Sequence, residues 1–500
     1  MKPTRNQRSK WTRSASAALL ATVAVGTGSL GFAGPAAANP AQETIFDAPR
    51  ELIGGATADQ RSNALAELDD LGVDTIRLLL PWRFLVPKPG FRQRPDGFNP
   101  ANPHEYPQFR YEAVDQVVRG AFARGMDVLM SPSSPTPNWG SATGNSRVRE
   151  PLPTEFEAFV TSLGRRYSGD FRPVPCDFLG TFFVPCPEPL PRVTSWSVYN
   201  EPNLDLFLKP QFKNGNPYAP RLYRELFLAA KRGLDVSGHG SDRVLIAETA
   251  PSGGFVGTEP LDFLRGVFCL DAKYRKRGSC EPLSAQGWAH HPYTPGIAPF
   301  EESDNPDLIN LATIDQLQRA LRLAARSGAT TKPLPIFITE YGVQSLPDRQ
   351  FGVSLKSQAE YIGIAEYLAF REPGIRAYGQ YLLSDDPLEQ EYAFTSGLRF
   401  NDGRPKPSLR AFPMTLVVKK RSDERVLIWG HVRPSGARRQ VTIRLDPARG
   451  APRRLRTIRT NARGYFQFTS RAGSARRWQA SVRLPDGRRL TGPFVRAYRF

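Results

Sequence analysis

The chain has 500 residues, 40% of them hydrophobic and 11% aromatic, and a formal net charge of +19 at pH 7. This is the composition of an ordinary globular protein, and no apolar run beyond the N-terminus is long enough to span a bilayer, which excludes a polytopic membrane protein. The charge is uneven, because residues 414–500 hold 22 Lys and Arg against 4 Asp and Glu, so the sequence predicts a mildly acidic body joined to a strongly basic C-terminal domain.

The N-terminus has the pattern of an export signal. A small, apolar run covers residues 15–33, and Ala36-Ala37-Ala38 offers a small-residue cleavage site. The run is preceded by five basic residues, Lys2, Arg5, Arg8, Lys10 and Arg13. A membrane anchor is the alternative, but the run is rich in Gly, Ser and Thr, and no stop-transfer pattern follows it. The sequence therefore predicts a signal peptide over residues 1–38 and a secreted, extracellular or cell-surface-associated protein.

The four cysteines fall into two local pairs, Cys176 with Cys186 and Cys269 with Cys280. We expect each pair to form a loop disulfide, which agrees with export to an oxidising compartment. Zinc binding is the competing interpretation. Neither pair has Cys-x-x-Cys spacing, however, and no histidine lies near the first pair, so a metal site is not predicted.

Residues 39–413 alternate between strand-like apolar runs and amphipathic helical runs, which is typical of a parallel α/β sheet. The expected strands cover residues 51–54, 75–80, 127–131, 193–199, 244–248, 285–290, 335–339 and 375–382. The expected helices cover residues 58–71, 111–124, 154–167, 218–236, 313–327 and 355–370. Eight such strands predict a (β/α)₈ TIM barrel, whose functional face lies at the C-terminal ends of the strands.

Two of these strands end on a glutamate. The fourth runs into Asn200-Glu201-Pro202, and the seventh runs into Glu340-Tyr341-Gly342. Because Pro202 disfavours helical geometry in the residue before it, Glu201 is expected to be extended at the end of its strand. The barrel topology then predicts that both carboxylates lie at one rim.

These two motifs resemble those of retaining glycoside hydrolases of the (β/α)₈-barrel clan that includes cellulases, mannanases and β-xylosidases, such as cellulase-like family 5 or family 39. The resemblance covers about residues 45–413 and does not reach the tail. It implies that Glu201 is the acid/base, that Asn200 binds the sugar 2-hydroxyl, and that Glu340 is the nucleophile. The implied substrate is a β-linked oligo- or polysaccharide.

The chemistry supports this interpretation, because cleavage with retention needs two carboxyls about 5 to 5.5 Å apart, one to donate a proton and one to attack carbon. Like charges so close push their pKa values apart, so one group stays protonated while the other stays ionised. The reaction requires no metal, nucleotide or redox cofactor. A catalytically silent, wall-associated carbohydrate-binding protein is the alternative, but a mere binder needs no such pair.

Further polar residues are expected at the strand ends. Arg77 lies on the second strand, where the clan commonly has an arginine near the nucleophile; a buried structural ion pair is the alternative. His291 and Tyr293 match a His-x-Tyr ending of strand six in several of these families, and Tyr293 could hydrogen-bond the nucleophile. His290 could instead be the functional histidine, and the sequence leaves this open. Glu248 ends the fifth strand and is expected to be a supporting residue.

Aromatic side chains at strand ends could stack on sugar rings, although most tryptophans are simply core residues. The candidates are Trp82, Trp139, Trp288 and Tyr381, with Trp139 as the best subsite candidate. The clan usually places a tryptophan at the end of strand eight, where this chain has Tyr381.

Beyond residue 413 the alternation of apolar and polar residues predicts short strands separated by turns. They cover residues 415–419, 425–431, 440–445, 455–460, 465–469, 478–484 and 494–498. This pattern predicts a small β-sandwich over residues 414–500. Its charge would attract an anionic cell-wall or extracellular polymer, although the arginines could also form an ordinary solvated face. No nucleic-acid motif accompanies the charge, so no specific nucleic-acid partner is expected.

Overall fold

The computed structural model describes residues 41–174, 187–254, 257–305, 308–390, 392–472 and 475–500, which fall in one compact unit. The predicted signal peptide and the predicted Cys176–Cys186 disulfide lie outside the described residues. Within the described part of the chain, no helix is long and apolar enough to cross a membrane.

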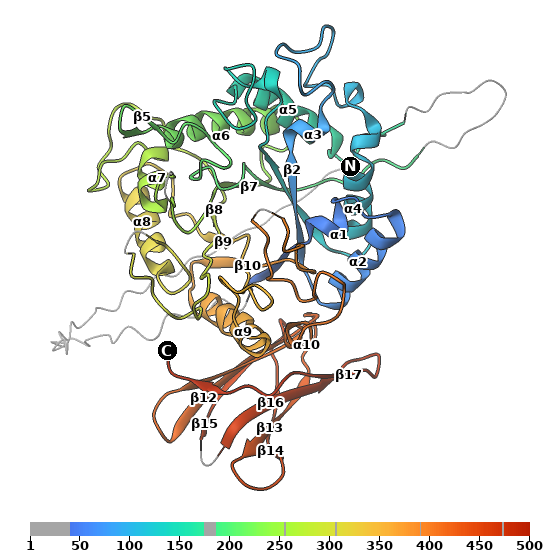
Figure 1. The fold of residues 1–500 in the computed structure, drawn as a ribbon, viewed down its shortest axis with the longest axis vertical. Helices are drawn as coiled ribbons and strands as arrows, with labels where there is room; N and C mark the ends of the chain where they lie inside the picture. Colours follow the sequence, from blue (N-terminus) through green and yellow to red (C-terminus); the bar gives the residue numbers. More distant parts are fainter. Residues whose placement is uncertain (1–40, 175–186, 255–256, 306–307, 391, 473–474) are drawn as a thin grey trace, which may run out of the picture. The chain divides into compact units, whose positions relative to one another are not determined.

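Eight parallel strands close into a barrel in the order β1-β10-β9-β8-β7-β4-β3-β2, with helices around them (Figure 1). The strands are β1 (Glu43–Asp47), β2 (Thr75–Pro81), β3 (Asp127–Ser133), β4 (Ser195–Ser197), β7 (Arg243–Thr249), β8 (Gly287–His290), β9 (Ile336–Ile338) and β10 (Ile375–Tyr381). β1 pairs with both β10 and β2, which closes the ring. The interior is packed with side chains, among them Ile45, Leu245 and Phe337. The TIM-barrel prediction is confirmed.

The main outer helices are α2 (Ala58–Asp70), α4 (Glu112–Phe122), α5 (Pro153–Arg166), α6 (Ala219–Val236), α7 (Pro260–Val267), α8 (Ile314–Arg326), α9 (Leu355–Arg371) and α10 (Pro407–Ala411). Local sequence fixes their ends. Thr57 and Gln60 form a capping box at the start of α2, satisfying backbone donors that the first turn leaves free. α6 begins with Pro220 in its first turn and buries Leu226, Ala230 and Leu234 at helical spacing against the barrel.

The first predicted strand is wrong. Residues 51–54 do not form a barrel strand; the strand is β1, Glu43–Asp47, and Pro49–Leu52 form the short helix α1. Pro49 explains the difference, because its fixed φ suits the first turn of a helix and it lies directly after the buried strand. Helix α7 and a late strand of the tail, β17 (Arg489–Thr491), were not predicted from the sequence.

The tail forms two four-stranded sheets, β15-β12-β11-β18 and β14-β13-β16-β17. The remaining strands are β11 (Met414–Lys420), β12 (Arg425–Val432), β13 (Gln440–Pro447), β14 (Arg453–Arg459), β15 (Tyr465–Arg471), β16 (Ala475–Arg483) and β18 (Ala497–Tyr498). Met414, Ile428, Ile443 and Val482 belong to one buried core supplied by both sheets. The predicted β-sandwich is therefore confirmed.

A buried ion cluster joins the tail to helix α9. Glu366 of α9 accepts hydrogen bonds from Arg433 (2.7 Å) and His431 (2.5 Å) of the tail. Burial acts to raise the pKa of Glu366, but Arg433 and His431 outweigh it and lower the pKa to about 2. The carboxylate therefore stays charged at neutral pH and is fully paired.

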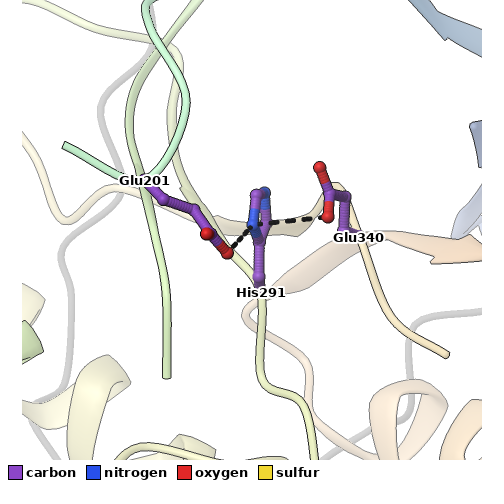
Figure 2. A group of neighbouring side chains, drawn as sticks. All are labelled: Glu201, His291 and Glu340. Atoms are coloured by element: carbon purple, nitrogen blue, oxygen red, sulfur yellow. Dashed lines mark hydrogen bonds and ion pairs between the residues drawn. The ribbon is translucent and has the colours of Figure 1, made fainter. Parts of the chain in front are cut away.

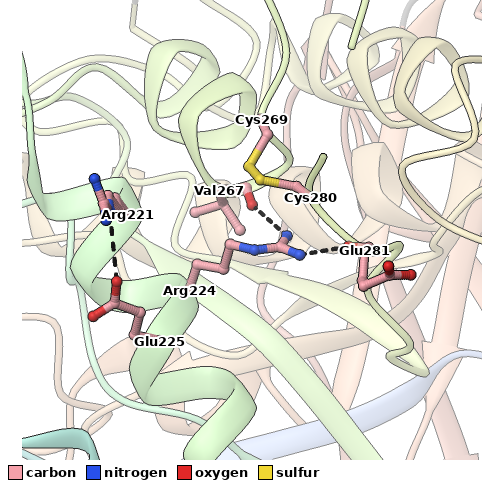
Figure 3. Close-up of a disulfide and its surroundings, with 7 residues drawn as sticks. All are labelled: Arg221, Arg224, Glu225, Val267, Cys269, Cys280 and Glu281. Atoms are coloured by element: carbon pink, nitrogen blue, oxygen red, sulfur yellow. Dashed lines mark hydrogen bonds and ion pairs between the residues drawn. A yellow bond between two sulfur atoms is a disulfide. The ribbon is translucent and has the colours of Figure 1, made fainter. Parts of the chain in front are cut away.

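The predicted Cys269–Cys280 disulfide is formed, and it closes a loop between α7 and β8 (Figure 3). Arg224 of α6 lies beside it and donates to the backbone oxygens of Val267 (3.0 Å) and Glu281, one on each side of the bridge. The loop between the fifth and sixth barrel strands is thus held by one covalent bond and one buried guanidinium.

Candidate active site

The backbone at the ends of β4 and β7 adopts an unusual conformation. Tyr199 has φ 77°, Glu201 φ 41°, Ala247 φ 92° and Glu248 φ 51°, all in the left-handed region that residues other than glycine rarely enter. Pro202 predicted an extended Glu201, and this prediction is wrong. The backbone turns at Glu201 so that its N–H donates to the backbone oxygen of Glu248 at 2.9 Å. Such left-handed non-glycine residues cluster at functional sites, where the surroundings hold them.

Glu201 and Glu340 come together at the barrel rim with His291 between them (Figure 2). One carboxylate oxygen of each glutamate lies within 4.8 Å of the other. The Nδ1 atom of His291 lies 2.9 Å from Glu201 Oε1 and 3.7 Å from Glu340 Oε2. Residues 139 positions apart in the chain thus form one compact pair, as their places at the ends of two barrel strands predict.

Arg77 of β2 is fully buried and binds four side chains. It donates to Glu340 at 2.5 Å, to Asp47 at 2.6 Å, to Asn200 at 2.7 Å and to Glu248. One guanidinium therefore holds groups from the ends of β1, β4, β7 and β9, including the candidate nucleophile. Because the oxygen of the Asn200 amide accepts from Arg77, its nitrogen is the end available to a sugar hydroxyl.

The two histidines have different surroundings. His290 bonds Thr249 and the backbone oxygen of Ile309, and burial lowers its pKa to about 3, so it is a neutral core residue. His291 instead contacts both Glu201 and Glu248. The geometry thus places His291, and not His290, in the candidate site.

Tyr293 completes the contacts of Glu340. Its hydroxyl donates to Glu340 Oε2 at 2.9 Å, as the sequence analysis anticipated. With Arg77 on Oε1, both oxygens of this carboxylate accept a hydrogen bond. The two donors stabilise its negative charge and fix its orientation toward the pocket.

Burial and neighbouring charges separate the titrations of the acids. Burial raises the pKa of Glu201, and the nearby Glu340 raises it further against the opposing effect of His291. Burial also acts to raise the pKa of Glu248, but Arg77 outweighs it and lowers the pKa to about 2. Burial acts to lower the pKa of His291, but the surrounding carboxylates, led by Glu340, raise it to about 10. At neutral pH the site therefore holds a protonated imidazolium and an ionised Glu248, beside a Glu201 whose raised pKa favours its protonated form.

A pocket of about 740 Å³ opens over these residues. Its polar lining includes Asp47, Asn200, Glu201, Tyr293 and Glu340. Its aromatic lining includes Phe207, Phe351, Tyr381, Tyr392 and Phe394. Flat apolar rings beside converging polar groups suit a sugar, which presents both C–H faces and hydroxyls.

The packing corrects the expectation for two tryptophans. Trp82 is 1% exposed and stacks on Phe159 at 5.5 Å between ring centroids, while Trp139 is 4% exposed and packs edge-on against Trp82. Neither lines the pocket, so neither can stack on a sugar there. Tyr381, in contrast, does line the pocket.

Sequence reasoning missed Asp47 and the phenylalanines of the lining. Asp47 is the last residue of β1. Burial raises its pKa, the positive charge of Arg77 lowers it, and the negative charge of Glu340 raises it, with a net value of about 7. The apolar pair Ile45-Phe46, directly before Asp47, was the signal that could have located it.

The contacts of His291 compete with metal binding at this site. Glu201, His291 and Glu340 could supply three ligand atoms that lie within 4.8 Å of one another. Both ring nitrogens of His291 are engaged with carboxylates, however, so a metal ion would have to displace these contacts and a proton that the raised pKa of the imidazole favours.

Several solved structures are similar to this chain. A family 39 glycoside hydrolase from the gut symbiont Bacteroides cellulosilyticus WH2 matches with a TM-score of 0.50 and 16% identity, over 86% of this chain and 79% of its own. The fold is that of the (β/α)₈ glycoside hydrolases. Two other glycoside-hydrolase structures align with a TM-score of 0.45: GH5_18 from Streptomyces cattleya (16% identity, 74% and 79% covered) and the β-glycosidase of Thermosphaera aggregans (14%, 74% and 95%). No family model matches the chain, and no curated protein matches it either.

In this glycoside-hydrolase fold the candidate pair follows β4 and β9, the fourth and seventh strands along the barrel. A carboxyl with a raised pKa, Glu201, lies close to a carboxylate held by two donors, Glu340. That arrangement can protonate a leaving oxygen while attacking the adjacent carbon.

Proposed function

We propose that the chain is a secreted retaining glycoside hydrolase that cleaves O-glycosidic bonds of a β-linked glycan by double displacement. The observation that carries the proposal is the approach of the Glu201 and Glu340 carboxylates to within 4.8 Å in the wall of a pocket. Inverting enzymes need a wider gap, because a water molecule must fit between the sugar and the base.

In the first step the Glu340 carboxylate attacks the anomeric carbon. The bond from that carbon to the leaving oxygen breaks, and Glu201 gives its proton to this oxygen, leaving a glycosyl ester on Glu340. In the second step Glu201, now ionised, takes a proton from water while the water oxygen attacks the same carbon. Glu340 leaves as the carboxylate and Glu201 is protonated again.

The other groups orient these two. Arg77 and Tyr293 hold the attacking carboxylate, and His291 holds Glu201. The Asn200 amide nitrogen is placed to bond the sugar 2-hydroxyl, a contact that strengthens as positive charge develops on the ring.

The charge of the pocket favours a neutral sugar over a uronic acid. The described residues that line the pocket include three acids, Asp47, Glu201 and Glu340, but no Lys or Arg. A sugar carboxylate would therefore meet the negative charge of Glu340, and no lining Lys or Arg, in a partly dry site. We expect kcat/KM for the best neutral aryl β-glycoside to exceed that for the aryl β-glucuronide by at least about tenfold.

A panel of aryl β-glycosides and polysaccharides tests the proposal. Wild type should release product from at least one of them, and Glu340→Gln should release none. No release by wild type would leave a carbohydrate-binding protein without turnover, and equal release by the variant would overturn Glu340 as the nucleophile. Faster hydrolysis of the glucuronide would overturn only the preference for a neutral sugar.

Glu201→Ala should separate the two chemical steps. For substrates with poor leaving groups we expect kcat to fall by about 10²–10⁴-fold, because no acid protonates the oxygen. Substrates with good leaving groups should be spared in the first step, and added azide should accelerate turnover and appear in a glycosyl azide of retained configuration. Absence of any azide product from an active variant would contradict the assignment of Glu201.

His291→Gln should move the basic limb of the pH profile. The imidazolium lowers the pKa of Glu201, so a neutral side chain at position 291 should let that pKa rise further. Activity needs protonated Glu201 and is lost as pH rises through its pKa, so the basic limb of kcat/KM should shift to higher pH. His104→Gln, at an exposed histidine, is the control and should leave both limbs in place. A basic limb that stays in place or moves lower in His291→Gln would rule out this coupling.

The rest of the chain fits an extracellular role in the same proposal. The signal peptide expected over residues 1–38 would export the protein, and the basic C-terminal domain would hold the barrel at an anionic wall polymer. Export would also favour the Cys269–Cys280 disulfide.

A further inference from the structure

The sheet β14-β13-β16-β17 turns one face to the core and one to solvent. Along β13, Val441 and Ile443 are fully buried, whereas Gln440 and Arg444 are exposed. Residues directly opposite each other on neighbouring strands point to the same face, so the strand register shows which residues share the outer face with Gln440 and Arg444. Six exposed arginines share it. One of them, Arg477, pairs with Asp446 on this same face, and we call the other five the arginine face: Arg444, Arg454, Arg459, Arg483 and Arg489.

Four of the five arginines repel one another across the strands. Arg444 lies directly opposite Arg454, and Arg483 lies directly opposite Arg489. Like charges in such positions destabilise a sheet. Within the described residues no carboxylate forms an ion pair with the arginine face, although other arginines of this domain do have acidic partners, such as Arg477 with Asp446. The acid on this outer face, Asp446, is thus already paired with Arg477, and the five arginines of the arginine face can be satisfied by an external anion.

The side chains between the arginines indicate the kind of anion. Gln440, Thr442, Thr457 and Thr491 lie on the same face and supply amide and hydroxyl groups. In the described part of residues 440–500, no large apolar side chain is exposed. The face thus lacks the aromatic platforms that single-stranded nucleic acids use and the apolar wedges that enter a membrane.

We propose that the arginine face binds an anionic polysaccharide. The guanidinium groups pair with carboxylate or sulfate groups along the polymer, and the threonines contact sugar hydroxyls. Arg459 lies opposite Gln440, and Arg454 lies opposite Arg444. Because Gln440 and Arg444 are four positions apart on β13, these two rows of arginines are about 13 Å apart along the strands. An extended polymer crossing the sheet can therefore reach both. This site is separate from the pocket and does not depend on catalysis.

Binding of the full-length secreted protein to immobilised polygalacturonate and dextran sulfate tests the site. Replacing all five arginines of the face by Gln should weaken binding to at least one of these polymers by at least about tenfold and flatten its dependence on NaCl between about 50 and 200 mM. The control changes Arg421, Arg425, Arg438, Arg449 and Arg471 to Gln. It removes the same charge from exposed positions elsewhere on the domain, including the opposed pair Arg425 and Arg471, and should weaken binding by less than about threefold.

Equal loss in both variants would show that net charge alone attracts the polymer and would overturn the site. Failure of wild type to bind either polymer, or tighter binding at matched salt to phosphatidylglycerol vesicles or single-stranded DNA, would also overturn it. The melting temperature of the face variant should stay the same or rise, because repulsion is removed. If that variant does not fold, Arg483→Gln with Arg489→Gln should give a smaller loss in the same direction.

Discussion

Replacing Glu340 by Gln is expected to lower kcat for the best aryl β-glycoside by at least about 10⁴-fold. The amide has nearly the same shape but cannot attack the anomeric carbon as an anion. Its neighbours Arg77 and Tyr293 would remain in place, so the loss should appear in kcat with little change in melting temperature. Continuous assays of product release give kcat, and thermal unfolding of the same preparations gives the melting temperature.

Glu225→Gln is the matched control. Glu225 lies on α6, where its side chain is 50% exposed and pairs with Arg221 (Figure 3). The same chemical change there should leave kcat unaltered, because a surface ion pair contributes little and is distant from the pocket. A Glu340→Gln variant that retains more than about a tenth of wild-type kcat would remove Glu340 from the role of nucleophile.

Replacing Arg77 by Met is expected to lower the free energy of unfolding at pH 7 by about 3–5 kcal/mol, and to lower kcat as well. The change leaves Asp47, Glu248 and Glu340 close together without their shared cation. Lost charge pairing raises the pKa of a carboxylate, so lower pH can relieve the repulsion by protonation. Denaturant unfolding should therefore show a smaller loss at pH 5 than at pH 7.

Two further variants serve as controls for Arg77→Met. Arg77→Lys keeps the charge but not the planar set of donors, so it should recover part of the stability and less of the activity. Arg221→Met removes an arginine whose side chain is 79% exposed, and it should cost less than about 1 kcal/mol. Equal destabilisation by Arg77→Met at both pH values would argue that lost packing, and not buried charge, dominates at position 77.

The fold was predictable where the sequence repeats a strong local pattern. β2, β3, β7 and β10 are seven-residue runs whose mostly buried, apolar character identifies them. β4 and β9 have three residues each, and their flanking motifs located them. β1 was missed because it has only five residues, and because Leu52-Ile53, at the end of α1, imitate a strand.

The candidate site was predictable to a similar degree. Glu201, Glu340 and Arg77 follow from motifs at strand ends, and the structure brings them together. Trp82 and Trp139 were misassigned, because a tryptophan at a strand end looks the same in sequence whether it faces a pocket or packs on a helix residue such as Phe159. Asp47 was not predicted because it ends β1, the one barrel strand that was placed wrongly. Packing across elements distant in sequence decided these cases.

The most direct test of the account is to trap the covalent intermediate. The protein is incubated with 2-deoxy-2-fluoroglycosides matching the aryl substrates it hydrolyses, and its mass and peptides are measured. The account predicts one added glycosyl unit, carried by the peptide that contains Glu340. An adduct on another residue, or none in a preparation that hydrolyses the matching aryl glycoside and is inactivated by the reagent, would contradict double displacement through Glu340.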